Sequence, residues 1–195
     1  MKELRVTQLT AETRADTAAA VESLILWGRP IVYDTPTTIH DPAGDYIEII
    51  KRGALDGADL SDVRLLYNHE LSKVPLARTP KTMQLTPGTA GLELTATLPD
   101  TNEARAVYEA VKRGDLDGMS FAFTVPAGGD HYDPATNTRT IYKIAKVYEC
   151  SVVPYPAYPQ TSIEARSARA ESLKNYKARQ AAKILINKIL LNSEV

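Results

Sequence analysis

Two side chains in this sequence are suited to nucleophilic catalysis, His69 and Ser120. His69 follows the apolar run at residues 63–67 and Asn68, so it lies at the end of an expected strand, where a side chain is held rigidly. A histidine base requires a nucleophile within hydrogen-bond reach and a third group that fixes its tautomer. By its local sequence alone, each of the two residues also fits a purely structural role.

Ser120 is distinguished from the other serines by its surroundings. Gly118 precedes it by two residues, and an apolar strand follows it and would hold the hydroxyl on a rigid element. In a regular strand, Ser120 and Ala122 share one face, and Phe121 lies on the other. Ala122 occupies the place of the second glycine of a Gly-x-Ser-x-Gly elbow, so the α/β-hydrolase pattern is excluded.

Other chemistries are less well supported. His40 precedes Asp41-Pro42 and His131 follows two glycines and an aspartate, so both are expected in loops. No two histidines have the i, i+3 or i, i+4 spacing of helical metal sites, and no phosphate-binding glycine loop is present. Cys150 is expected to face an apolar strand environment, which would raise its pKa and make it a poor nucleophile. We therefore expect no metal and no cofactor.

The elements that must position these residues are mainly strands. Runs rich in β-branched, aromatic or alternating apolar residues predict them at 22–27, 31–33, 46–50, 63–67, 92–98, 121–125, 140–144 and 148–153. A hairpin loop is expected at residues 133–137. We expect a mostly β (α+β) fold with flanking helices, forming a closed or nearly closed barrel.

Two helices are predicted. The first has Thr101 as its N-cap, Glu103 in its first turn and Gly114 as its stop signal. The second covers residues 170–191, where an apolar stripe lies beside a basic face. The prolines at 154–159 separate this second helix from the last strand.

Composition is that of an ordinary soluble protein. The chain has 195 residues, is 44% hydrophobic and 24% charged, and carries a net charge of -1, which argues against a dedicated nucleic-acid binder. No signal peptide or membrane span is expected, and the single cysteine fits a reducing cytoplasm. Residues 164–195 hold seven basic and three acidic side chains, a net +4, against -5 for the remainder. The basic tail is therefore expected to be a separate functional piece.

Six short segments between residues 48 and 159 occur in a fixed order, and in that order they resemble the prohead protease family of HK97-type tailed phages. The similarity covers roughly residues 20–166, and each motif is weak alone but specific in this order. The resembling segments are residues 48–55 (Glu-Ile-Ile-Lys-Arg-Gly-Ala-Leu), 63–70 with the Asn-His-acid motif, 75–79, 91–94, 113–123 around the serine, and 148–153 followed by 156–159. Position 55 carries leucine where the family usually has phenylalanine.

The resemblance implies a closed β-barrel of the herpesvirus-protease type and the chain order His, Ser, third member. It assigns Ser120 as nucleophile and His69 as base. Glu149 is the predicted orienting carboxylate, since its strand follows the nucleophile strand; Glu149 and Ser151 would point to one side of that strand. Glu70 is the alternative orienting group. The sequence does not locate the oxyanion hole: the candidates are backbone N–H groups around Ser120 or in a nearby loop, and the Arg166 side chain.

The implied function is a serine endopeptidase that cleaves scaffold or major-capsid-precursor segments inside the immature phage head, in the cytoplasm of the infected host. We expect a protease barrel domain at 1–163 and a helical tail at 164–195. We expect the tail either to dock on an acidic scaffold or a second subunit, or to pack on the barrel. Removal of the tail by self-cleavage near residue 164 is a further hypothesis. The rival hypothesis is a non-catalytic capsid-assembly (scaffolding) protein that keeps the barrel.

Overall fold

The computed structural model describes the backbone of residues 3–8 and residues 24–41 and 43–154 in full. The predicted helix at 170–191, the charge boundary at 164 and Arg166 lie outside these residues. The elements are β1 (Glu3–Gln8), β2 (Ile25–Val32), β3 (Thr37–Ile39), β4 (Tyr46–Ile50), β5 (Arg64–Tyr67), β6 (Ala77–Arg78), β7 (Met83–Pro87), β8 (Gly91–Thr97), α1 (Asn102–Arg113), β9 (Gly118–Thr124), β10 (Asp130–Asp133), β11 (Thr138–Ile141) and β12 (Lys146–Val153).

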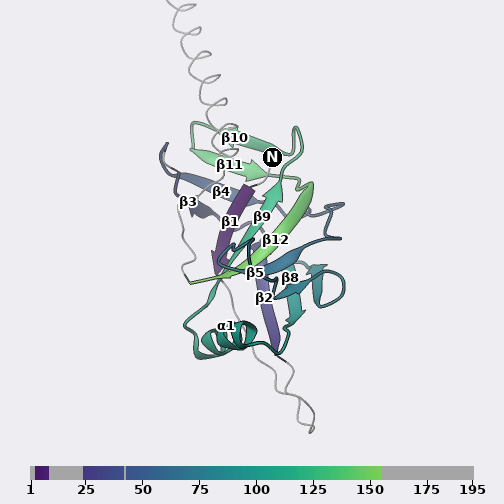
Figure 1. Ribbon diagram of the computed structural model, residues 1–195. Helices are drawn as coiled ribbons and strands as arrows, with labels where there is room; N and C mark the ends of the chain where they lie inside the picture. Colours follow the sequence, from purple (N-terminus) through teal and green to yellow (C-terminus); the bar gives the residue numbers. More distant parts are fainter. Residues whose placement is uncertain (1–2, 9–23, 42, 155–195) are drawn as a thin grey trace, which may run out of the picture.

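The strands form three sheets. The five-stranded sheet has the order β1-β9-β12-β5-β6, the four-stranded sheet β10-β11-β4-β3, and the three-stranded sheet β2-β8-β7. In Figure 1, β9 lies between β1 and β12, and β12 is the middle strand of the five-stranded sheet. Most neighbours are antiparallel, but β12 pairs with β5, and β11 with β4, in parallel.

The prediction of a closed barrel is wrong for the described part of the chain. Each of the three sheets there is open, with β1 and β6 as the edges of the largest. β2 lies close to β1 and β9, but its ladder is formed with β8. Closure requires every strand to be paired on both sides with a consistent stagger. An alternating pattern shows which face of a strand is buried and does not show which strand is its neighbour, so the same strands fit open, packed sheets.

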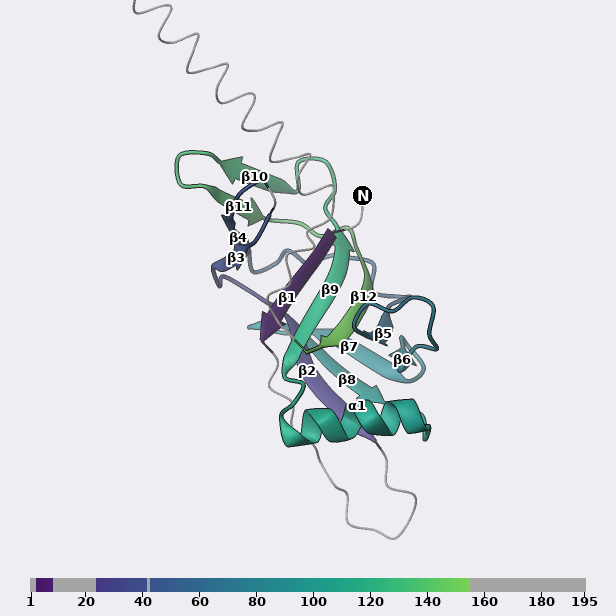
Figure 2. The ribbon, with the colours of Figure 1, turned by 60° about the vertical axis from the view of Figure 1, so that its left-hand side comes forward.

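The helix predicted after Thr101 is confirmed as α1. The Thr101 side chain accepts a hydrogen bond from the Ala104 N–H, and Gly114 ends the helix with a φ of 83°. An N-cap such as Thr101 contributes about 1 kcal/mol to helix stability. The left-handed conformation at the C-terminal position favours glycine, as at Gly114. Figure 2 shows α1 across the end of β2 and β8. No helix in the described residues is long and apolar enough to cross a membrane.

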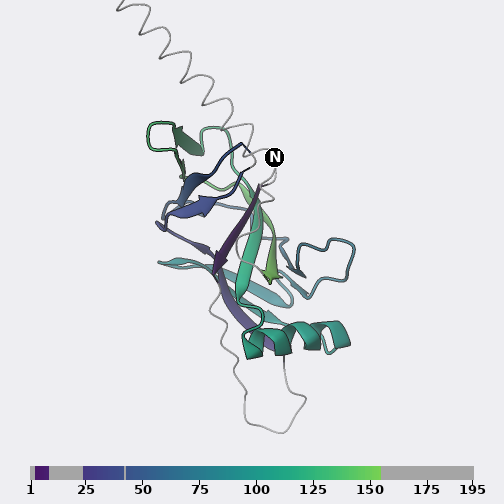
Figure 3. The same ribbon diagram turned by 90° about the vertical axis from the view of Figure 1, so that its left-hand side faces the viewer.

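The main core lies between the five- and three-stranded sheets and α1. Phe121 and Phe123 of β9 are fully buried there, with stacked rings 5.2 Å apart. Every residue of β9 is buried, so the strand is covered on both faces. Figure 3 shows the four-stranded sheet at the opposite end of β9 from α1. A strand that is paired on both edges and covered on both faces provides a rigid position for any side chain that it carries.

The four-stranded sheet contains the predicted hairpin. Residues 134–137 connect β10 and β11, and Asn137 has a positive φ of 53°, which asparagine tolerates better than most residues. His131 was expected in a loop, but it lies in β10 and pairs with Thr140. The loop signal belongs to Gly128 and Gly129, which precede β10. The strand begins at Asp130, so His131 is already its second residue.

Candidate active site

The candidate site is built on β9 and β12, two neighbouring antiparallel strands. Their register places Ser120 opposite Ser151 and Ala122 opposite Glu149. Residues directly opposite each other in an antiparallel pair point to the same face of the sheet. The side chains of Ser120, Ser151 and Glu149 therefore share one face, while alternating residues such as Phe121 face the main core.

A β-bulge in β12 sets this arrangement. Val147 lies opposite Phe123, but Glu149 lies opposite Ala122, so Tyr148 is the extra residue. One extra residue shifts the alternation of the strand. Val147 and Cys150 can both contribute to the core as a result, and Glu149 is turned to the face that carries Ser120.

His69 reaches this face from β5, which runs parallel to β12. The chain leaves β5 after Tyr67 and turns through Asn68 and His69, whose φ angles of 50° and 59° are both left-handed. Such a conformation costs non-glycine residues roughly 1–2 kcal/mol each. The turn is held by a hydrogen bond from the Asn68 N–H to the Val152 carbonyl at 2.9 Å. The His69 N–H donates to the Ser151 Oγ at 3.2 Å.

The imidazole of His69 contacts the carboxylate of Glu149 directly. His69 Nδ1 lies 2.7 Å from Glu149 Oε1. The glutamate side chain is 4% exposed, whereas the histidine side chain is 26% exposed. An ionised carboxylate only accepts hydrogen bonds, so Nδ1 carries the proton in this contact. The other ring nitrogen, Nε2, is then the one available to accept a proton.

The structure therefore brings two of the three predicted catalytic residues into contact and places the third on the adjacent strand. Ser120 is fully buried and lies opposite Ser151, whose hydroxyl accepts the His69 N–H. Glu70, the alternative orienting group, is directed elsewhere: its carboxylate pairs with Lys73 at 3.4 Å.

The other two histidines lie apart from this cluster. His40 follows β3 and pairs through Nδ1 with Asp45 at 2.9 Å, with both side chains about half exposed. His131 belongs to β10, in a different sheet from β5, β9 and β12. Among residues 3–8, 24–41 and 43–154, no group of three or more His, Cys, Asp or Glu side chains is arranged to hold a metal ion.

Cys150 sits between two members of the cluster in sequence but faces the core. Complete burial raises the pKa of its thiol well above the usual value, and the negative charge of Glu149 raises it further. The thiolate, which is the nucleophilic form, is thereby disfavoured. The expectation that burial raises the pKa of this cysteine is confirmed.

The backbone of β9 is poorly placed to stabilise an oxyanion. The strand is paired along its length with β1 on one edge and β12 on the other. In such a strand the N–H groups point along the sheet into the two ladders. The donors for a developing negative charge must therefore come from another segment. Arg166, the side-chain candidate from the sequence, lies outside the described residues.

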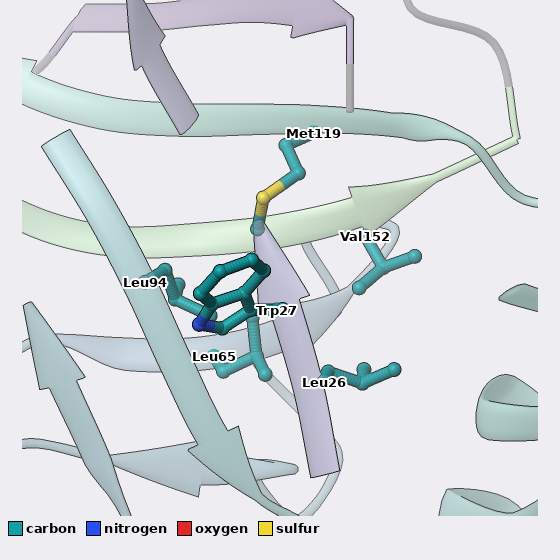
Figure 4. A pocket seen from close by; sticks show the side chains of 6 residues that line it. All are labelled: Leu26, Trp27, Leu65, Leu94, Met119 and Val152. Atoms are coloured by element: carbon teal, nitrogen blue, oxygen red, sulfur yellow. The ribbon is translucent and has the colours of Figure 1, made fainter. Parts of the chain in front are cut away.

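A small apolar pocket lies on the opposite side of this sheet. Figure 4 shows its lining, which comprises Leu26, Trp27, Leu65, Leu94, Met119 and Val152. Met119 and Val152 are sequence neighbours of Ser120 and Ser151, so their side chains point to the other face. The strands β9 and β12 separate this pocket from the His69–Glu149 pair.

Ser151 was not assigned a role from the sequence, although it makes two contacts in the cluster. Its hydroxyl donates to Glu149 Oε2 at 2.6 Å and accepts from the His69 N–H. The available signal was its position two residues after Glu149, which places both on one side of a strand. Its contact with His69 depends on the pairing of β5 with β12, which the sequence does not show.

The chain matches the model of a known protein family. The family model described as caudovirus prohead serine protease matches residues 9–179 of the chain. Neither the curated proteins nor the solved structures contain a match. The matched range includes β2 to β12 and therefore all the residues of the candidate site.

Proposed function

The chain belongs to the caudovirus prohead serine protease family, and we propose that it cleaves capsid-precursor or scaffold segments with Ser120 as nucleophile, His69 as base and Glu149 as orienting carboxylate. One observation carries the assignment of residues: the 2.7 Å contact between His69 Nδ1 and the buried Glu149, beside the strand that bears Ser120.

This pairing supplies what a weak nucleophile requires. A serine hydroxyl attacks only when a base removes its proton during the attack. A buried carboxylate at Nδ1 fixes the tautomer in which Nε2 accepts that proton, and it stabilises the imidazolium that forms. Ser120 and Glu149 lie on paired strands and His69 lies in a hydrogen-bonded turn directly after β5, so the three residues are carried by ordered backbone.

The proposed reaction has two stages. Ser120 Oγ attacks the scissile carbonyl carbon while its proton passes to His69 Nε2, giving a tetrahedral oxyanion. The C–N bond then breaks as His69 returns the proton to the leaving amine, and an acyl-Ser120 ester remains. His69 then takes a proton from a water molecule as the water oxygen attacks the ester carbon. The bond from this carbon to Ser120 Oγ breaks, His69 returns the proton to Oγ, and the new carboxyl terminus is released.

The substrates and the place of action follow from the family as proposals. Major-capsid-precursor or scaffold segments enclosed in the immature head are the expected substrates, which places the reaction inside the assembling phage head of an infected host. Release of the basic tail by self-cleavage near residue 164 is included in the proposal, because the charge of the chain changes sign there.

The deciding experiment follows intact masses over time when the chain is co-expressed with its capsid precursor. Wild type is compared with Ser120→Ala and with Ser72→Ala, a matched change at an exposed serine close to His69. We expect defined precursor fragments from wild type and Ser72→Ala and none from Ser120→Ala.

Two outcomes would contradict the proposal. Equal fragments from Ser120→Ala would remove this serine from the chemistry. Absence of fragments from all three proteins, with capsid assembly still dependent on the chain, would favour the non-catalytic scaffolding protein. A shortened wild-type chain, with its new end near residue 164, would establish self-cleavage, and an intact chain that cleaves the precursor would exclude it.

A further inference from the structure

We propose that Ser151 is a positioning residue, which holds the Glu149 carboxylate and the His69 backbone through a single hydroxyl group. The proposal rests on the function proposed above and extends it to a fourth residue. Ser151 does not touch the reacting atoms in this scheme. It acts through the two residues that it connects.

Burial and distances support this role. Ser151 is fully buried, and its Oγ lies 2.6 Å from Glu149 Oε2 and 3.2 Å from the His69 backbone nitrogen. Glu149 uses its other oxygen, Oε1, for the imidazole. The carboxylate is therefore held at both oxygens, and it cannot rotate about its own axis without losing one of the two contacts.

The hydrogen-bonding capacity of a hydroxyl fits both contacts at once. A serine has one proton to donate and two lone pairs that accept. The backbone N–H of His69 can only donate, so Ser151 Oγ accepts there and gives its proton to Glu149. The hydroxyl of Ser151 thus contacts the Glu149 carboxylate and the His69 backbone rather than the imidazole, so we assign it positioning and leave the role of nucleophile with Ser120.

The hydrogen bond from the His69 N–H to Ser151 Oγ stabilises the strained turn. Asn68 and His69 are consecutive non-glycine residues with positive φ, and such strain persists only where the surroundings hold it. Ser151 accepts the amide proton of His69 itself, so it fixes the Cα from which the imidazole extends. One side chain thus sets the origin of the base and the orientation of its partner.

The test uses a fluorophosphonate probe, which phosphonylates a nucleophilic serine without requiring a known cleavage sequence. For Ser151→Ala we expect the maximal rate of labelling at Ser120 to fall about 10- to 100-fold, as loss of a hydrogen bond to a charged group implies. The probe concentration for half-maximal rate should stay within about 2-fold, since no binding contact is removed.

A double-mutant comparison separates positioning from simple destabilisation. If Ser151 acts through Glu149, then Ser151→Ala should cost less than about 3-fold further in a Glu149→Gln background. Thr79→Val serves as the control, since the buried Thr79 hydroxyl also both donates and accepts, but its partners are the Leu60 carbonyl and the Val63 N–H rather than members of the cluster. It should lower thermal stability and leave the labelling rate unchanged.

A spectroscopic readout does not depend on activity. The Nδ1 proton of His69, shared with a carboxylate, should give a downfield proton NMR signal that is absent in His69→Gln and is shifted or broadened in Ser151→Ala. If Ser151→Ala does not fold, Ser151→Cys keeps the side-chain volume with a much weaker hydrogen-bonding group. The cysteine variant should then show the same loss of rate and the same spectral change.

The outcomes distinguish the two proposals. Wild-type protein that is not labelled at Ser120 would contradict the proposed function, while the NMR signal would still report whether Ser151 orders the pair. Labelling of Ser151 itself would overturn the positioning role. So would a wild-type rate in Ser151→Ala, or an equal loss of rate in both backgrounds of the double-mutant comparison.

Discussion

Two buried glutamates, Glu149 and Glu48, show how the partner of a carboxylate decides what it can do. Each residue as a whole is 3% exposed, and each lies in a strand that is paired in parallel with a neighbouring strand. Glu48 of β4 faces Arg139 of β11, with Nη1 3.1 Å from Oε2, and the arginine side chain is itself 3% exposed. Asp130 contacts the same guanidinium on its other side.

The difference lies in the proton. The guanidinium of Arg139 stays protonated at any pH at which a protein folds, so its pair with Glu48 is a permanent ionic link. An imidazole such as that of His69, unlike a guanidinium, has a ring nitrogen that can accept a proton from a reacting group and return it. Its side chain is also 26% exposed, whereas both members of the other pair are enclosed. The Arg139–Glu48 pair is suited to hold a sheet together, and the His69–Glu149 pair is suited to transfer protons.

Loss of the carboxylate at the titratable pair should give the largest effect. Glu149→Gln keeps the side-chain volume but places an amide beside Nδ1 and permits the wrong tautomer. We expect precursor cleavage to fall roughly 10³- to 10⁴-fold, with the fold retained. The rate of fragment formation by mass spectrometry and the circular dichroism spectrum measure the two properties.

Glu70→Gln is the matched control for this prediction. Glu70 adjoins His69 in sequence but pairs with Lys73, so its loss should change the cleavage rate by less than about 3-fold. A large loss in Glu70→Gln together with a small one in Glu149→Gln would reverse the assignment of the orienting carboxylate.

Loss of the fixed cation should give the opposite result, a large loss of stability with little change in catalysis. Arg139→Met leaves the buried Glu48 without its cation, which typically costs about 3–5 kcal/mol of unfolding free energy. Urea unfolding measures this loss, and the cleavage rate per folded molecule should stay close to that of wild type.

Arg29→Met provides the reference for an exposed pair, since Arg29 and Glu93 are about half exposed and 3.4 Å apart. Its cost should be below about 1 kcal/mol. If Arg139→Met were equally mild, the buried cluster would not be the structural link inferred here. If it abolished cleavage in folded protein, the two glutamates would not have separate roles.

An exposed carboxylate completes the comparison with the smallest expected effect. Hydrogen bonds from Lys146 and Ser61 hold the pKa of Asp59 well below its usual range. A depressed folded pKa stabilises the fold above the unfolded pKa, and this contribution is lost as the pH falls through the folded value. Asp59→Asn should therefore lower the urea midpoint slightly at pH 7.

The midpoints of wild type and Asp59→Asn should converge as the pH drops below about 4, where the unfolded carboxyl group protonates. Unfolding curves at several pH values between neutral and acid measure the gap. A gap that stays constant or widens on acidification would show that the change acts through something other than the charge of Asp59.

Local elements were predicted well where the signal is local. The cap at Thr101, the stop at Gly114 and the apolar positions between them specify α1 without reference to the rest of the chain. The hairpin loop predicted at residues 133–137 is likewise specified by its own turn-forming residues, and it connects β10 to β11. The barrel prediction failed because closure depends on pairings between distant strands, such as β1 with β9, which alternation does not encode.

The sequence by itself determined the family, the residue types able to do the chemistry, and the burial pattern of regularly alternating strands such as β8. These depend on ordered motifs and on short-range periodicity. Only the tertiary structure decided that His69 meets Glu149 and that Ser151 joins them. Those contacts span about 80 residues of chain and require the parallel pairing of β5 with β12 and the bulge at Tyr148. Register between distant strands is set by the packing of the whole core, so no local pattern contains it.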